Sequence, residues 1–286
     1  MPELPEVTAL ASFLSERTAG RAIDRAEMFA SRALKTSDPP LDSVDGRPLN
    51  GATRRGKFVI LDLGGPKLVF HLAKNGWVNW NAQVPENPGR HERGPLAMRV
   101  RLDDASGFDL TEEGTFKRLA VHLVDDPEQV AGIASLGPDA LDPDLDSAGL
   151  AQLFGGHRAR LKNLLTNQKV IAGIGNAYSD EILHRAQLSP FRIAAEMTPY
   201  QFKRLYEAMR SVLNEAVDQL TGHGPQTLKD HKRAGLRIHG RAGEPCPGCG
   251  GVIREVAHGD SPFQYCPACQ TDGELLPNTR DLEPGH

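Results

Sequence analysis

The spacing of the four cysteines constrains the fold of this chain more than any other sequence feature. Cys246 and Cys249 are separated by two residues, as are Cys266 and Cys269, and sixteen residues lie between the two pairs. Two Cys-x-x-Cys pairs at this separation are typical of a zinc ribbon, in which a hairpin brings both pairs to one ion. Because four thiolates complete a tetrahedral coordination sphere, we expect one structural zinc ion with no position left for catalysis.

Two disulfides are the alternative interpretation of the same cysteines. Disulfides are rare in a reducing compartment. The acidic start of the chain lacks the pattern of a signal peptide, and no apolar run approaches the ~20 residues of a membrane span. We therefore expect a cytoplasmic protein with no membrane partner, in which the cysteines bind metal.

The charge of the chain is distributed unevenly. The 286 residues suit two domains, and 39% hydrophobic with 24% charged residues is an ordinary globular composition. A formal net charge of −4 argues against a uniformly basic nucleic-acid binder, but residues 153–254 contain fifteen Lys or Arg against eight Asp or Glu. We expect a polyanion to contact mainly the C-terminal half.

The N-terminal part of the chain is predicted to form a β-sandwich or flattened barrel with a leading helix. Apolar residues recur at helical spacing between residues 5 and 18. Residues 58–63 and 68–72 are apolar and flank Gly64-Gly65-Pro66, which indicates a β-hairpin. Residues 97–102 alternate between apolar and polar side chains, as a half-buried strand does.

Helical periodicity returns in the C-terminal half. Residues 161–170 and 178–185 are predicted helices joined by a glycine-rich turn, and Thr198-Pro199-Tyr200-Gln201 has the pattern of a capping box with a proline at the first helical position. The expected fold is α+β with two domains. Its segments are the β-sandwich domain at 1–125, a Pro-, Asp- and Gly-rich linker at 126–147, a helical domain at 148–235, the zinc finger at 236–270 and a polar tail at 271–286.

The first six residues combine a proline at position 2 with two carboxylates, Glu3 and Glu6. Once Met1 is removed, Pro2 offers a secondary amine, and even an ordinary α-amino group has a pKa of ~8 against ~10.4 for lysine. Its attack on an aldehyde-like carbon gives an iminium that keeps its charge and acts as an electron sink, while the carboxylates handle protons. The alternative is that the prolines only begin a helix.

The glycine turn Gly173-Ile174-Gly175-Asn176 follows a predicted helix rather than a strand, so it does not fit a dinucleotide-binding motif. A helix, glycine turn and second helix suit a nucleic-acid phosphate, because exposed N–H groups and the positive end of the second helix face it. Asn176 adds a side-chain donor and Lys169 adds charge. The alternative is an ordinary glycine-rich helical hairpin.

Five motifs occur in one order along the chain: Pro2-Glu3-Leu4-Pro5-Glu6, Arg54-Arg55-Gly56-Lys57, Gly137-Pro138-Asp139, Gly173-Ile174-Gly175-Asn176 with Glu181, and His239-Gly240-Arg241 before the cysteines. Together they resemble the formamidopyrimidine-DNA glycosylase/endonuclease VIII family over essentially the whole length. The resemblance implies a catalytic β-sandwich domain, a helix–two-turn–helix DNA-binding domain and a zinc finger. It also implies a monomeric, nucleoid-associated enzyme of bacterial type that acts on double-stranded DNA containing damaged bases or abasic sites.

The resemblance further implies roles for individual residues. Pro2 would attack C1′ of a nucleotide flipped out of the duplex, with Glu3 and Lys57 as the other catalytic residues. Glu6 and Glu181 would support the N-terminus. The expected DNA contacts are His71, Lys74, Phe116, Lys169, Asn176 and Arg241. Lys57 as a solvated lysine at a strand end, and His71 as a half-buried strand histidine, are the alternatives.

Four departures from the family pattern bear on substrate choice. Lys74 stands where a methionine usually fills the gap left by the flipped base, and Thr115-Phe116 stands where Arg-Phe is common. Ser261 replaces a phosphate-binding arginine, and residues 227–237 leave no room for the long loop that covers 8-oxoguanine in some members. We expect oxidised pyrimidines, ring-opened purines or abasic sites to be better substrates than 8-oxoguanine opposite cytosine.

Three other functions remain alternatives. The altered residues at positions 74, 115 and 261 are compatible with an abasic-site lyase that has little glycosylase activity. A damaged-DNA-binding protein without turnover would keep the fold but has no use for the Pro2-Glu3 pair. A zinc-ribbon accessory factor of transcription or translation would explain the cysteines and nothing at the N-terminus.

Overall fold

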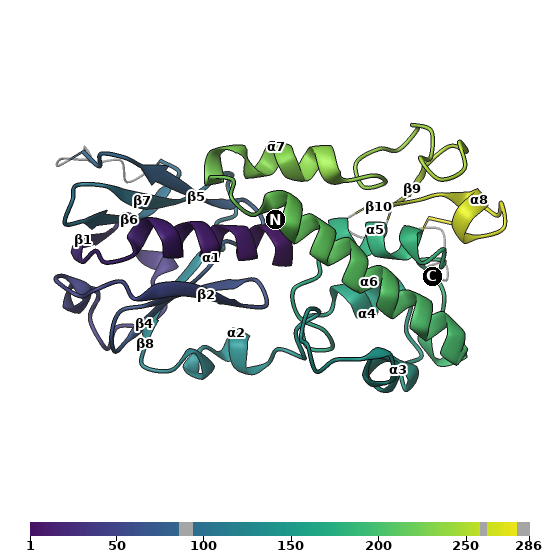
Figure 1. Ribbon diagram of the computed structural model, residues 1–286, viewed down its shortest axis with the longest axis horizontal. Coiled ribbons are helices and arrows are strands. Elements are labelled where there is room, and N and C mark those ends of the chain that lie inside the picture. The colour runs from purple at the N-terminus through teal and green to yellow at the C-terminus, as the bar shows by residue number, and fades with distance from the viewer. Residues whose placement is uncertain (86–93, 258–261, 279–286) are drawn as a thin grey trace, which may run out of the picture. The chain divides into compact units, whose positions relative to one another are not determined.

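The computed structural model describes residues 1–85, 94–257 and 262–278 and contains two compact units (Figure 1). Unit 1 comprises Met1–Ser135 and Val217–Lys232. Unit 2 comprises Leu136–Ala216 and the chain from Arg233 onward. The helices α6 (Pro199–Leu220) and α7 (Pro225–Gly235) each contribute residues to both units.

Unit 1 is built on two four-stranded antiparallel sheets, and this confirms the predicted β-sandwich. One sheet has the strand order β1-β6-β7-β5 and the other has the order β2-β3-β4-β8. The strands are β1 (Ile23–Met28), β2 (Gly51–Arg55), β3 (Phe58–Asp62), β4 (Lys67–His71), β5 (Gly76–Asn81), β6 (Leu96–Leu102), β7 (Gly107–Glu112) and β8 (Ala120–Val124).

The hairpin of β3 and β4 has the register that its sequence indicates. Leu61 pairs with Leu68 and Asp62 pairs with Lys67 across the turn, where Gly64 adopts a φ of +71°. A positive φ of this kind is readily adopted by glycine. The hairpin therefore forms where two apolar runs meet a glycine turn.

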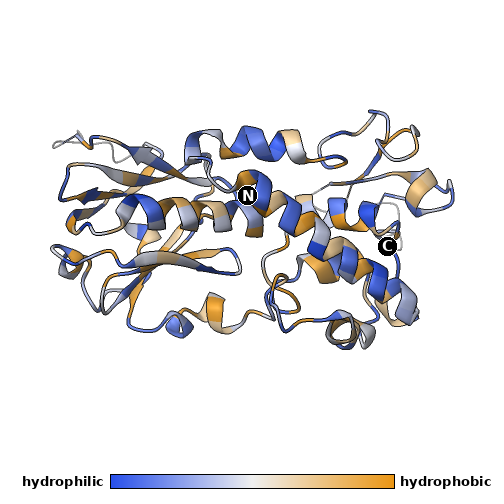
Figure 2. Cartoon of the chain, in the orientation of Figure 1, coloured by the Kyte–Doolittle hydropathy of each residue, from blue (hydrophilic) through white to orange (hydrophobic). Residues whose placement is uncertain are grey.

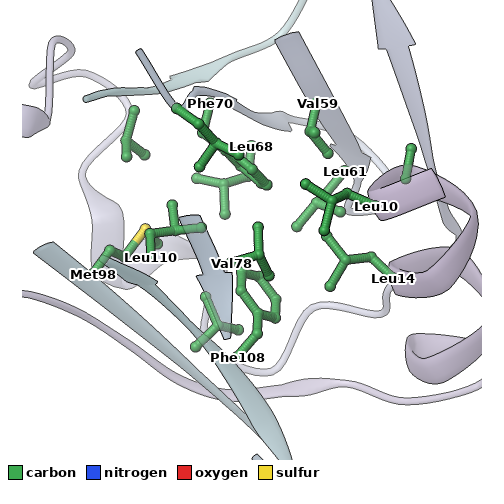
Figure 3. Packing of buried hydrophobic residues seen from close by; sticks show 14 of the residues in the cluster. Leu10, Leu14, Val59, Leu61, Leu68, Phe70, Val78, Met98, Phe108 and Leu110 are labelled. Atoms are coloured by element: carbon green, nitrogen blue, oxygen red, sulfur yellow. The ribbon is translucent and has the colours of Figure 1, made fainter. Parts of the chain in front are cut away.

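The helix α1 (Leu4–Thr18) completes the core of unit 1. It ends at Thr18, two residues before Gly20, whose φ is +73°. Leu10 and Leu14 point from α1 into a cluster of fully buried side chains supplied by both sheets (Figure 3). Burial of such a side chain contributes roughly 1.5–3 kcal/mol relative to leaving it in water. The neighbours from the sheets that Figure 3 labels are Val59, Leu61, Leu68, Phe70, Val78, Met98, Phe108 and Leu110.

Residues after β8 pack on the other face of the second sheet. The short helices η3 (Pro127–Gln129) and α2 (Ala131–Ala134) place Val130 and Ile133 against Val69 of β4. The remaining short helices of unit 1 are η1 (Ser31–Ala33) and η2 (Leu41–Val44).

The end of α6 and most of α7 belong to unit 1. Leu220 and Leu228 are buried in the same core cluster as α1. The indole Nε1 of Trp77 donates a hydrogen bond to the carbonyl of Pro225 at 2.9 Å. These contacts anchor α7 to the sandwich, although α7 is largely hydrophilic (Figure 2).

Unit 2 is mainly helical around the glycine turn. Its helices are α3 (Ser147–Gly155), α4 (Leu161–Thr166), α5 (Asn176–Arg185), η4 (Ala194–Glu196) and most of α6. The predicted capping box of α6 is present, since Gln201 N–H donates to Thr198 Oγ1 and Thr198 N–H donates to Gln201 Oε1. The helix expected over residues 161–170 ends at Thr166, because Asn167 has an extended ψ of 105°.

The cysteine-rich part of unit 2 is a small antiparallel ribbon. It contains β9 (Arg254–Val256), β10 (Phe263–Tyr265) and α8 (Pro267–Gln270). With the sandwich and the helices, this ribbon confirms the predicted α+β class. Within the described ranges, every helix is too short or too polar to cross a lipid bilayer.

Candidate active site and metal centre

The N-terminus of α1 carries two buried carboxylates beside Pro2. Glu3 is 3% exposed and Glu6 is 1% exposed, and Pro2 is buried as well. Glu6 occupies the third position of the helix, so its side chain reaches back and its Oε2 accepts the backbone N–H of Glu3 at 2.8 Å. The proline-rich start of the helix therefore holds both carboxylates next to the chain terminus.

A lysine from the distant helix α7 completes this cluster. The Nζ of Lys232 donates to Glu6 Oε2 at 2.6 Å and lies 3.9 Å from Glu3 Oε1. Burial lowers the pKa of Lys232, but the attraction of Glu3 and Glu6 outweighs it, so the pKa is raised above its ordinary value. Lys232 therefore carries a full positive charge beside the two carboxylates at neutral pH.

Lys57 contributes a second amine to the same surroundings, and this one is buried. It follows Gly56 in the turn between β2 and β3 and is only 6% exposed. Burial lowers its pKa, Glu3 opposes this effect, and Lys232 adds to it. The interpretation of Lys57 as a solvated lysine is therefore wrong.

The chain terminus itself meets an environment that disfavours a charged amine. The pKa of the Met1 α-amino group is lowered, first by burial and then by repulsion from Lys232, while Glu3 and Glu6 oppose the shift. A neutral amine keeps its lone pair available, so this environment suits a nucleophile.

His71 lies at the end of β4, where its ring packs against Phe58 with the ring centroids 4.7 Å apart. Its Nδ1 accepts the backbone N–H of Ala73 at 3.2 Å. Burial, with a smaller effect from Lys57, lowers the pKa of His71 to about 4. His71 is therefore neutral at pH 7.

The two residues predicted to contact DNA from loops of unit 1 are both accessible. Lys74 is exposed just after Ala73, which adopts a φ of 53° in the turn before β5. Phe116 is 84% exposed in the loop before β8, and Thr115 is exposed beside it. A phenylalanine of this exposure gains nothing from the core, so it is free to contact another molecule. Ser261 lies outside the described residues.

In unit 2, the glycine turn is shaped by a side chain that the sequence analysis did not single out. Gln168 donates through Nε2 to the carbonyl of Ile174 at 2.7 Å, and its Oε1 accepts the N–H of Gly173 at 3.0 Å. Gly173 has a φ of 103°. Asn176 donates through Nδ2 to the carbonyl of Pro262 at 2.8 Å, whereas Lys169 is exposed.

The buried carboxylate of Glu181 holds the segment that leads into the cysteines. It accepts the backbone N–H groups of Arg237, Ile238 and His239 at 2.9–3.0 Å. Burial raises its pKa, and these three hydrogen bonds oppose the rise. Arg241 follows this segment and donates through Nε to the carbonyl of Leu236 at 2.7 Å.

A second buried network joins the glycine turn to the same segment. Lys162 donates to the carbonyl of Asn176 at 2.8 Å and forms an ion pair with Asp180. The other oxygen of Asp180 lies 2.6 Å from Nδ1 of His239. Both side chains of the ion pair are buried, so the network positions α5 and the start of the finger rather than a ligand.

The four cysteine sulfurs converge as a metal site requires. All four lie within 4.8 Å of one another, with 3.8 Å between Cys246 and Cys269 and 3.5 Å between Cys249 and Cys266. Four sulfurs placed ~2.3 Å from one zinc ion in a tetrahedron are about 3.8 Å apart. The donor set and its spacing therefore fit a metal ion. His184 Nε2 is a further neighbour, 3.2 Å from Cys246 Sγ.

The structure thus collects the predicted residues in two places. Glu3, Glu6 and Lys57 act on one another around the terminus in unit 1, whereas Asn176, Glu181 and the cysteines belong to unit 2. Lys232 and Gln168 contact the predicted site residues or the glycine turn, but the sequence did not predict either of them as a site residue. No local pattern identifies Lys232, because its partners are more than 220 residues away in the sequence.

Comparisons with known proteins match both parts of the chain. A model of the formamidopyrimidine-DNA glycosylase N-terminal domain matches residues 1–119, and a model of the formamidopyrimidine-DNA glycosylase H2TH domain matches residues 136–226. A formamidopyrimidine-DNA glycosylase of Symbiobacterium thermophilum is 34% identical over 281 residues, which cover 94% of this chain and 89% of that protein. An uncharacterized formamidopyrimidine-DNA glycosylase-like protein of Mycobacterium tuberculosis is 54% identical over 146 residues, which cover 51% of this chain and 91% of that protein.

Solved structures share the fold. The Fpg protein of Thermus thermophilus superimposes with a TM-score of 0.79 at 28% identity and covers 96% of this chain and 100% of that one. Lactococcus lactis Fpg, in a complex with DNA that contains an abasic site, superimposes with a TM-score of 0.83 at 22% identity and covers 94% of this chain and 99% of that one.

Proposed function

Because the chain belongs to the formamidopyrimidine-DNA glycosylase family, we propose that it is a base-excision-repair DNA glycosylase that also cleaves the strand at abasic sites. Its partner is double-stranded DNA that contains a damaged base or an abasic site. The observation that carries the proposal is the environment of the terminus, where burial and Lys232 lower the pKa of the α-amino group. Removal of Met1 would make the secondary amine of Pro2 the new terminus, and Pro2 is itself buried beside Glu3 and Glu6.

The reaction begins when the neutral amine of Pro2 attacks C1′ of a nucleotide flipped out of the duplex. The new N–C1′ bond replaces the bond from C1′ to the base, and the base leaves with the bonding electrons and takes up a proton. Opening of the sugar ring then moves a bonding pair onto O4′, which Glu3 protonates. The product is an iminium between Pro2 and C1′, and the proton that Glu3 gives to O4′ is the one its ionised carboxylate takes from the Pro2 amine after the attack.

Strand cleavage follows from the electron demand of this iminium. Removal of a proton from C2′ leaves an electron pair that forms a C1′–C2′ enamine, and the C3′–O bond breaks to release the 3′ phosphate. A second elimination, again driven by the electron-withdrawing iminium, expels the 5′ phosphate. Water then hydrolyses the remaining imine and restores the Pro2 amine.

Several described side chains are suited to bind the DNA backbone and the region around the flipped-out nucleotide. Lys57 interacts with the N-terminal carboxylates, neutral His71 lies near Lys57, and Lys74 is exposed three residues after His71. Exposed Phe116 fills the gap in the base stack. In unit 2, exposed Lys169, the turn at Asn176 and the guanidinium of Arg241 bind phosphates. Glu181 was predicted to support the N-terminus, and the contacts described for it are to the backbone N–H groups of residues 237–239, which precede Arg241.

The lesion preference follows from α7. Residues 225–235 form a continuous helix, so the chain lacks a long loop between α6 and the finger segment. A protein without such a cover makes few contacts with a flipped-out 8-oxoguanine. We therefore expect oxidised pyrimidines, ring-opened purines and abasic sites as substrates. Rapid, selective excision of 8-oxoguanine opposite cytosine in a panel of defined duplexes would contradict this preference.

The four cysteines hold one structural zinc ion in this proposal. Their thiolates complete its coordination, so the ion stabilises the ribbon that carries β9 and β10 and takes no part in the chemistry. The protein acts as a monomer in the bacterial cytoplasm, associated with the nucleoid.

Trapping with borohydride tests the covalent step. Reduction of the iminium should join the protein to abasic-site DNA through Pro2, and mass spectrometry of the N-terminal peptide locates the bond. Pro2→Gly should reduce the trapped fraction strongly. The intact mass of the purified protein shows whether Met1 is removed, and an undiminished adduct in the Pro2→Gly variant would refute the role of Pro2.

An abasic-site lyase with little glycosylase activity is the second candidate. Lys74 favours it, because an exposed lysine does not replace an apolar wedge in the space left by a flipped base. The two functions are distinguished by measuring strand nicking on equal amounts of a duplex with a preformed abasic site and a duplex with an intact lesion. The second candidate predicts nicking of the abasic duplex alone.

A further inference from the structure

The ion pair between Lys232 and Glu6 connects α7 to the proposed catalytic terminus. We propose that Lys232 is a positioning residue that holds Glu6 and Glu3 in place and sets the charge around the N-terminal amine. This inference rests on the proposed function of that terminus. It assigns a task to α7 that the local sequence does not indicate.

The geometry places Lys232 at the centre of the carboxylate pair. One oxygen of Glu6 accepts both the Lys232 ammonium, at 2.6 Å, and the backbone N–H of Glu3, at 2.8 Å. The same ammonium lies 3.9 Å from Glu3 Oε1. Lys232 therefore restrains both carboxylates through one contact point.

The helix that carries Lys232 is itself fixed to the sandwich. The carbonyl of Pro225 accepts the indole N–H of Trp77, and Leu228 is fully buried in the core. These contacts lie at the start and in the middle of α7, less than three turns from Lys232. The lysine side chain thus extends from a rigid support.

Charge decides what the lysine does to the amine. Within the described part of unit 1, the charged groups that act on the terminus are Glu3 before α1, Glu6 of α1, Lys57 after β2, and Lys232 of α7. Loss of Lys232 leaves both carboxylates and removes one positive charge, whatever the protonation of Lys57. The terminus would then hold its proton to a higher pH, because the carboxylates stabilise a cationic amine.

Lys229 provides a matched comparison on the same helix. Its Nζ lies 4.5 Å from the centroid of the Trp77 ring, and it is not among the groups that shift the terminal amine. A Lys229→Met variant removes the same charge and the same length of side chain from α7. It controls for the overall charge of the protein and its affinity for DNA.

The experiment measures single-turnover borohydride trapping on DNA with a preformed abasic site, as a function of pH. The acidic limb of the profile is the pH range in which the trapping rate rises as the N-terminal amine loses its proton. In Lys232→Met, this limb should shift to higher pH by about one unit. Lys229→Met and Lys232→Arg should keep the limb of the wild-type protein. A role confined to stability would lower the amount of active protein without moving the limb.

A charge-compensated variant keeps the test decisive if Lys232→Met folds poorly. Glu6→Gln alone should move the limb to lower pH, because it removes a negative charge near the amine. Addition of Lys232→Met to Glu6→Gln should move the limb back up toward its wild-type position. The role of Lys232 would be overturned if Lys232→Met had the same limb as the wild-type protein and Glu6→Gln/Lys232→Met had the same limb as Glu6→Gln.

The result separates this inference from the proposed function. If the wild-type protein traps abasic DNA and Lys232→Met leaves the acidic limb at the same pH in both the wild-type and the Glu6→Gln background, only the role of Lys232 fails. If the wild-type protein forms no adduct at any pH, the proposed function fails with it.

Discussion

The Nζ of Lys232 lies 2.6 Å from Oε2 of Glu6, although the two residues are 226 positions apart in the sequence. The carboxylate is 1% exposed, so water does not solvate it in place of the lysine. The pair therefore brings a residue of α7 to the first turn of α1. The charge of the terminus depends on this contact.

Replacement of Lys232 by methionine should destabilise the protein. The change leaves the buried carboxylate of Glu6 without its cation, and removal of one partner of a buried pair costs about 3–5 kcal/mol. Urea unfolding should show this loss in the free energy of unfolding. Lys229→Met, on the same helix, should cost much less, and the Glu6→Gln/Lys232→Met double variant should recover part of the loss. A cost for Lys232→Met no larger than that of Lys229→Met would contradict the prediction.

His71 should make the free energy of unfolding depend on pH below neutrality. Its pKa is about 4 in the folded protein, because of burial and then of Lys57, and ~6.5 in an unfolded chain. Above pH 6.5 the histidine is neutral in both states. As the pH falls, the unfolded chain takes up a proton first, so stability is lost, by about 2 kcal/mol between pH 8 and pH 5. In His71→Gln this part of the pH dependence should disappear, as measured by denaturant unfolding at both pH values.

Gly137 should tolerate no side chain. A Cβ at this position would lie 2.5 Å from the carbonyl oxygen of Val170 and 2.7 Å from that of Lys169. Both are backbone atoms close to the glycine turn, so Gly137→Ala should lower the melting temperature of unit 2 and weaken binding to DNA. Gly156→Ala is the control, because a Cβ there meets nothing within 4 Å. Similar melting temperatures for the two variants would contradict the prediction, because they would show that the backbone near Val170 shifts to accommodate the added methyl group.

Removal of zinc should unfold the cysteine-rich ribbon and leave the sandwich intact. Metal analysis should find one zinc ion per chain, and Cys249→Ser should lower that content. Binding of structural zinc contributes about 10–16 kcal/mol in isolated fingers, so a chelator should abolish a cooperative transition of unit 2. The unfolding of unit 1, which contains none of the cysteines, should be unchanged. Protein that is free of zinc yet shows the same two transitions would disprove the metal site.

Features with short-range causes were predictable from the sequence. The β3–β4 hairpin needs two apolar runs and a glycine turn, and the capping box of α6 needs Thr198 and Gln201 three residues apart. The cysteine pairs likewise specify a metal knuckle within four residues each. The family also followed from motifs, and the comparisons confirmed it.

Long-range contacts were not predictable in the same way. The sequence by itself determined the β-sandwich class, the first helix and α6, the clustering of the four cysteines and the pair of carboxylates at the terminus, because periodicity and spacing express local stereochemistry. Only the tertiary structure decided that Lys232 faces Glu6, that Lys57 is buried and that Glu181 holds the backbone at residues 237–239. The protonation of a buried group depends on the charges packed around it, and those charges come from segments that are far apart in the chain.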